Sequence, residues 1–123
     1  MRKISIRAGE ITATATLKTN ETADAIWNAL PIEGHANTWG DEIYFSIPVD
    51  VESAKDARDT VSIGELGYWP PGNAFCIFFG RTPASHGSEP RAASPVNVFG
   101  QVEGDATAFK GVRGGTKVRI EKA

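Results

Sequence analysis

The feature that most constrains the fold is the alternation of apolar and polar residues in short segments separated by turn residues. Residues 4–7 alternate in this way, and residues 11–17 do so again after Gly9 and Glu10. A period of two is typical of half-buried β-strands, and a glycine between two such segments indicates a tight turn. The two segments therefore predict a β-hairpin with one solvent-facing side.

A single stretch of the chain has a helical pattern instead. In residues 21–30 the apolar side chains recur every three to four positions, which places them on one face of a helix. Asn20 precedes the stretch and is a favoured N-cap residue, whereas Pro31 follows it and favours a helix end. The sequence predicts one principal α-helix over about residues 21–30.

Strand patterns return after the helix. Ile43, Phe45 and Ile47 alternate with polar residues and are expected to face the core. Glu42 and Tyr44 must then point to the opposite side of the same strand. Further strands are predicted at 60–63, 74–79, 96–102 and 118–120, with a surface connection at 50–59 and a long irregular segment at 80–94.

Many short strands with turn signals between them, together with one helix, favour a mainly β fold, a closed or nearly closed β-barrel. The chain has 123 residues, which suits a single domain over residues 1–123. Lys and Arg number 13 against 15 for Asp and Glu, so nothing in the charge favours nucleic acid or a membrane as partner. The lone Cys76 excludes an internal disulfide, and the N-terminal residues lack a signal-peptide core, so we expect a cytoplasmic protein.

Three blocks of the sequence resemble one known family. They are NTWGDEIYF at 37–45, GYWPPGNAFCIFFG at 67–80 and SPVNV at 94–98. In order and spacing they are similar to the cyclophilin-like family of small bacterial and archaeal proteins of unknown function, distant relatives of the cyclophilin peptidyl-prolyl isomerases. The resemblance extends over essentially the whole chain and implies a compact cyclophilin-like closed β-barrel.

The resemblance does not imply the isomerase reaction, because fold alone does not transfer activity. Cyclophilin isomerases use an arginine in a Phe-His-Arg block as a donor to the prolyl amide nitrogen. This sequence has no such block, and the strand that should supply it carries Glu42. We therefore expect no efficient isomerase, with a weak isomerase that uses Arg91 as donor as the alternative.

The sequence gives little support for metal binding, a cysteine nucleophile or a phosphate-binding loop. His35 and His86 have no ligand neighbours at metal-binding spacing, so we expect neither a metal nor another cofactor. Cys76 lies in the most apolar segment, where burial makes a thiol unreactive, and we interpret it as structural. The glycine-rich residues 111–117 indicate a hairpin turn rather than a phosphate loop.

Strand parity nevertheless predicts a ligand groove on the outer surface of the barrel. Its floor is apolar and its rim carries a carboxylate, an amide and a cation from the long loop, which suits a small molecule or a short peptide. The candidate binding residues are Glu42, Tyr44, Trp69, Phe75, Phe78, Arg91 and Asn97. Two alternatives stay open: an ordinary solvated strand with aromatic side chains that cap the barrel, and a non-catalytic protein-interaction module.

Overall fold

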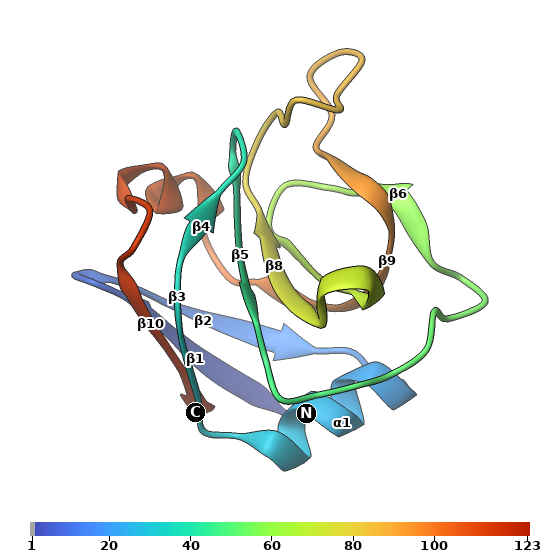
Figure 1. The fold of residues 1–123 in the computed structure, drawn as a ribbon. Helices are drawn as coiled ribbons and strands as arrows, with labels where there is room; N and C mark the ends of the chain where they lie inside the picture. The colour runs from blue at the N-terminus through green and yellow to red at the C-terminus, as the bar shows by residue number, and fades with distance from the viewer. Residues whose placement is uncertain (1) are drawn as a thin grey trace.

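The computed structural model describes residues 2–123 and is mainly β. Figure 1 shows strands that curl around a common interior, with one helix at one end. The strands are β1 (Lys3–Ala8), β2 (Ile11–Leu17), β3 (Ile32–His35), β4 (Asn37–Thr38), β5 (Glu42–Ser46), β6 (Arg58–Thr60), β7 (Glu65–Trp69), β8 (Ala74–Phe78), β9 (Arg91–Val102) and β10 (Lys117–Lys122). The helices are α1 (Glu21–Ala29) and the 3-10 helices η1 (Pro70–Gly72) and η2 (Ala106–Gly111).

Backbone pairing joins the strands in the order β3-β10-β1-β2-β9-β7-β8-β5-β4, and β6 pairs with β9. Every pair is antiparallel. The two ends of this order, β3 and β4, follow one another in the chain, but no backbone pairing within residues 2–123 joins them. The mainly β, antiparallel class is confirmed, whereas hydrogen-bonded closure of the barrel is not.

The hairpin and the helix form as predicted. Gly9 supplies the left-handed turn between β1 and β2, with φ at +63°. Helix α1 begins after Asn20, whose side-chain oxygen accepts a hydrogen bond from the Ala23 N–H at 2.8 Å. The last helical residue is Ala29, two residues before Pro31, as expected for a chain that a proline terminates.

The long strand β9 pairs with β2, β7 and β6 along its length, and the buried apolar residues form two clusters. The larger cluster contains Ile43, Phe45 and Ile47, so the predicted inward face of β5 is confirmed. The smaller one, here called the second cluster, lies on the other face of β5, β7 and β8. It contains Val61, Ala74, Cys76, Phe78, Ala92, Val96 and Val98, with Tyr44 and Trp69 packed against it.

Two local predictions are wrong, and one short helix was not predicted. The strand expected at 60–63 lies earlier, at β6, because Gly64 turns the chain with φ at +91° and leaves Ile63 exposed. The irregular segment ends at Pro90 rather than at residue 94, since Arg91 already pairs with β6. Helix η2 was not predicted; it begins at Ala106, after the N-cap residue Asp105, whose side chain accepts from the Thr107 N–H. Within residues 2–123, no helix has the length and apolar character needed to cross a membrane.

Candidate functional site

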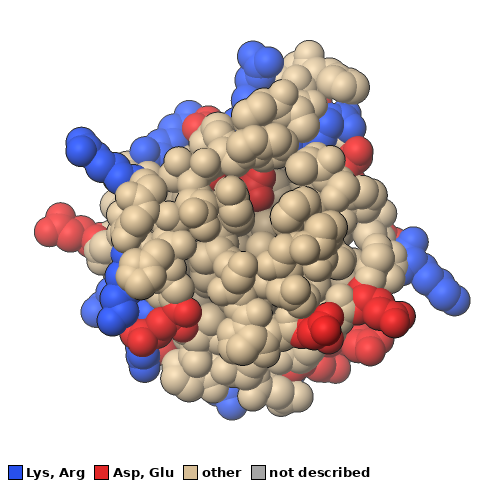
Figure 2. Space-filling view, in the orientation of Figure 1, with Lys and Arg blue, Asp and Glu red and all other residues tan. Residues whose placement is uncertain are grey.

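A recess opens on the outer face of β5, β7, β8 and β9. Figure 2 shows a hollow in this side of the molecule, with acidic atoms inside it and uncharged residues around it. The recess has a volume of about 220 Å³ and is called the aromatic pocket below. Its lining residues are Trp39, Glu42, Tyr44, Trp69, Cys76, Ala92 and Ala93.

Strands β5 and β8 form the floor of the aromatic pocket. Alternation along β5 places Glu42 and Tyr44 on the face opposite the main core, as the sequence predicted. In the register of the two strands Tyr44 lies opposite Cys76, and Glu42 lies opposite Phe78. The carboxyl, the phenol and the thiol therefore share one small area of the sheet.

Two indole side chains form the walls. Trp39 lies in the turn between β4 and β5, where its backbone N–H donates to the Glu42 carbonyl at 3.0 Å. Trp69 ends β7, and its Nε1–H donates to Ser94 Oγ on β9 at 2.7 Å. Ala92 and Ala93 complete the wall on β9, and their small side chains keep the recess open.

The Glu42 carboxyl is the charged group of the aromatic pocket. Glu42 is only 5% exposed, and burial raises the pKa of its carboxyl to about 7. The neighbouring Cys76 thiol opposes this rise but does not cancel it. Among the ion pairs within residues 2–123, none involves Glu42. This carboxyl therefore changes its charge near neutral pH.

Cys76 is buried, as the sequence predicted. Burial raises the pKa of its thiol well above the ordinary value, and the neighbouring Glu42 raises it further. The thiol is neutral at physiological pH, so it is a poor nucleophile. Its contribution to the aromatic pocket is an apolar surface and a weak hydrogen-bond donor.

Phe75 and Phe78 were predicted to be candidates for the same groove, but both are fully buried. Phe75 stacks on Phe45 in the main core, with ring centroids 5.2 Å apart. Phe78 belongs to the second cluster and fills space beneath the aromatic pocket without lining it. Residues 74–79 are all apolar because both faces of β8 are buried. The sequence therefore did not show which side chains face the main core and which face the second cluster.

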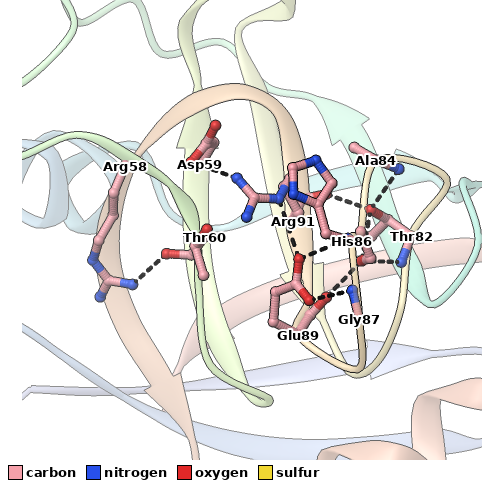
Figure 3. A network of polar contacts seen from close by, with 10 residues as sticks. Arg58, Asp59, Thr60, Thr82, Ala84, His86, Gly87, Glu89 and Arg91 are labelled. Carbon is pink, nitrogen blue, oxygen red and sulfur yellow. Dashed lines mark hydrogen bonds and ion pairs between the residues drawn. The ribbon is translucent and has the colours of Figure 1, made fainter.

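Arg91 does not line the aromatic pocket. Figure 3 shows its guanidinium between Asp59 and Glu89, with N–O distances of 3.3 and 3.2 Å. Hydrogen bonds from the His86 and Gly87 backbone N–H groups lower the pKa of Glu89 to about 2. Arg91 thus ties the preceding loop to β6, and its Nε and one terminal nitrogen are paired with these two carboxylates.

Asn97 lies away from the aromatic pocket and anchors the segment between β5 and β6. Its amide oxygen accepts from the Ala54 N–H at 2.8 Å, and its amide nitrogen donates to the Glu52 carbonyl at 2.9 Å. The same nitrogen donates to Thr22 Oγ1 at 3.2 Å. A buried amide with this set of partners has a structural role.

The structure thus brings together Glu42, Tyr44 and Trp69 of the seven candidates. Sequence reasoning missed Trp39, Cys76, Ala92 and Ala93 as lining residues. Trp39 lies in the turn between β4 and β5, where strand parity gives no direction. In residues 2–123 no group of three or more His, Cys, Asp or Glu side chains is arranged to hold a metal ion.

Comparison with known proteins identifies the family to which this chain belongs. The sequence model of the Cyclophilin-like family matches residues 2–121, so the chain belongs to that family. A solved structure that it resembles is the solution structure of a hypothetical protein from Archaeoglobus fulgidus, with 41% sequence identity and a TM-score of 0.83. The similarity covers 99% of this chain and 95% of the archaeal one. No similar sequence was found among curated proteins.

Proposed function

We propose that this chain is a binding domain for a small molecule, which occupies the aromatic pocket. The observation that carries the proposal is a buried carboxyl, Glu42, on the floor of an apolar recess between Trp39 and Trp69. A carboxyl in such surroundings opposes folding, and groups with strongly shifted pKa values concentrate at functional sites. Apolar walls around a few polar groups are typical of ligand pockets.

The size of the aromatic pocket favours a small ligand. Its volume of about 220 Å³ lies below the range of roughly 300 to 1,000 Å³ that is common for drug-sized ligands. A small metabolite fits this space, and so does a single side chain of a peptide whose remaining residues stay outside. The concave shape argues against a flat protein-interaction surface.

The isomerase alternative has no comparable support. Among the described residues that line the aromatic pocket there is no arginine, and Arg91 pairs with two carboxylates elsewhere. The donor that weakens the prolyl amide bond in cyclophilins therefore has no counterpart in the lining.

A fragment screen by thermal shift tests the proposal, because a ligand that binds the folded state raises the melting temperature. The decisive variant is Ala93→Phe, which fills the recess from an exposed position on β9. Ala108→Phe is the matched control, on exposed surface in η2. We expect fragments that stabilise the wild type and Ala108→Phe but not Ala93→Phe. Fragments that stabilise all three proteins equally would contradict the proposal.

A further inference from the structure

This chain has two buried glutamates on neighbouring parts of one sheet, and they differ in their partners. Glu65, 7% exposed, receives two hydrogen bonds from the Arg58 guanidinium at 2.9 and 2.8 Å and a third from the Ser62 N–H at 2.7 Å. Burial alone would raise the pKa of Glu65, but these partners outweigh it and leave the pKa lowered. Glu65 is therefore a buried carboxylate that is stabilised by hydrogen bonds within the protein.

Glu42 lacks such partners. It is as buried as Glu65, yet within residues 2–123 no Lys, Arg or His forms an ion pair with it, and a weak thiol donor on Cys76 is its polar side-chain neighbour. A carboxylate oxygen has room for several hydrogen bonds, and these acceptor positions face a recess that is open to solvent. The missing partner of this carboxylate can therefore come from a ligand.

The walls of the aromatic pocket favour a positively charged ligand, as the Glu42 carboxylate does. The faces of tryptophan and tyrosine rings carry negative potential and attract cations. Trp39, Tyr44 and Trp69 all line the space next to Glu42. A neutral ligand would leave the carboxylate unpaired in apolar surroundings, and an anionic ligand would be repelled by it.

From this arrangement we infer that the ligand of the aromatic pocket carries a protonated amine, whose ammonium group binds Glu42 between the indole walls. The inference rests on the proposed function and specifies its ligand class. The remaining lining is apolar, with Cys76, Ala92 and Ala93, so the body that carries the ammonium is small and apolar. The chemistry recognised is thus that of a small alkylammonium or arylalkylammonium ion.

The inference makes binding depend on pH, because only the ionised Glu42 pairs with an ammonium ion. The other titratable groups that face Glu42 are Tyr44 on β5 and the neutral thiol Cys76 on β8. The turn contributes Trp39, β7 contributes Trp69 and β9 contributes two alanines, and none of these side chains titrates. Changes in affinity below pH 7 therefore report on Glu42.

A matched set of probes tests the inference: benzylamine, benzyl alcohol and benzoate, which share a ring and differ in charge. Their dissociation constants are measured by NMR titration at pH 8 and at pH 5.5, where benzylamine stays protonated. At pH 8 we expect benzylamine to bind at least about tenfold more tightly than benzyl alcohol, and benzoate to bind least. At pH 5.5 the preference for benzylamine should fall by more than about tenfold, because few Glu42 side chains remain ionised.

Two variants test whether the preference for benzylamine comes from Glu42. Glu42→Gln keeps the shape of the side chain and should remove the preference for benzylamine, while Glu10→Gln, on the exposed turn after β1, should leave it unchanged. If Glu42→Gln does not fold, Trp39→Leu replaces it and should weaken benzylamine binding several-fold through the loss of one indole wall.

The outcomes separate this inference from the proposed function. Equal binding of benzylamine and benzyl alcohol, both blocked by Ala93→Phe, overturns the amine inference and leaves the proposed pocket intact. A preference for benzylamine that survives Glu42→Gln also overturns it. Failure of benzylamine to bind overturns the inference as well, and the fragment screen then decides the proposed function by itself.

Discussion

The Cys76 thiol on β8 lies beside the Glu42 carboxyl on β5, and the two groups affect each other's pKa in opposite directions. The thiol lowers the pKa of the carboxyl, whereas the carboxyl raises the pKa of the thiol. Burial dominates for both, so the thiol stays neutral and the carboxyl titrates at about pH 7. Both side chains line the aromatic pocket.

Replacement of Glu42 by glutamine should change how stability depends on pH. The folded state holds the Glu42 proton up to about pH 7 and the unfolded state releases it near pH 4.5, so the free energy of unfolding falls as pH rises through this window. The fall is at most about 3 kcal/mol, since each pKa unit corresponds to about 1.4 kcal/mol. Glutamine does not titrate, so the free energy of unfolding of Glu42→Gln does not fall in this way. Relative to the wild type, Glu42→Gln should therefore gain up to about 3 kcal/mol of stability between pH 4 and pH 8.

Urea denaturation across pH 4 to 8 measures this difference. The control Glu10→Gln should follow the wild-type curve, since Glu10 is exposed. Parallel curves for Glu42→Gln and the wild type would show that Glu42 has an ordinary pKa.

Substitution of Cys76 should shift the titration of Glu42. In Cys76→Ala the carboxyl loses the neighbouring thiol that lowers its pKa, so we expect its pKa to rise above that of the wild type. Cys76→Ser keeps a donor and should show a lower pKa than Cys76→Ala. The carbon-13 signal of the Glu42 carboxyl, followed by NMR from pH 4 to 9, measures all three values. An unchanged pKa in Cys76→Ala would contradict the described contact.

Much of this site was predictable from strand alternation. Once Ile43 and Phe45 were assigned to the core, Glu42 and Tyr44 had to share the opposite face, and the structure places them there. Parity could not decide between Phe75 and Phe78, because both faces of β8 are apolar and the second cluster was not predicted as a separate unit.

The roles of Arg91 and Asn97 could not be predicted, because Asp59, which pairs with Arg91, and the partners of Asn97 lie far away in the sequence. Asp59 and Ala54 reach them only through the fold of β6 and the preceding segment. Each side chain has polar groups that could bind a ligand, yet these groups bind other residues of the protein. Local sequence gives the type of a polar group and not its partner.

Asn97 should therefore matter for stability and not for ligand binding. Asn97→Ala removes the hydrogen bonds to Ala54, Glu52 and Thr22, and we expect the free energy of unfolding to fall by about 1 to 3 kcal/mol. Fragments that bind the wild type should bind Asn97→Ala with unchanged affinity. Loss of fragment binding in a folded Asn97→Ala protein would instead place this residue at the site.

Prolyl isomerase activity should be absent or very weak. The described lining of the aromatic pocket has no arginine, and the Arg91 guanidinium is held by Asp59 and Glu89. A protease-coupled assay with a short Xaa-Pro peptide measures the rate, with a cyclophilin isomerase as reference. A rate near that reference, lost in Arg91→Ala, would restore the isomerase alternative.

The central claim, that the aromatic pocket binds a small ligand, is tested most directly through the three indole N–H signals of the protein. Trp39 and Trp69 line the pocket, whereas Trp27 on α1 packs against Arg2 and Lys122 and provides an internal control. Titration with each stabilising fragment, followed by nitrogen-15 NMR, should shift the Trp39 and Trp69 signals and leave the Trp27 signal in place. Saturable binding that leaves both pocket signals unmoved would contradict the account.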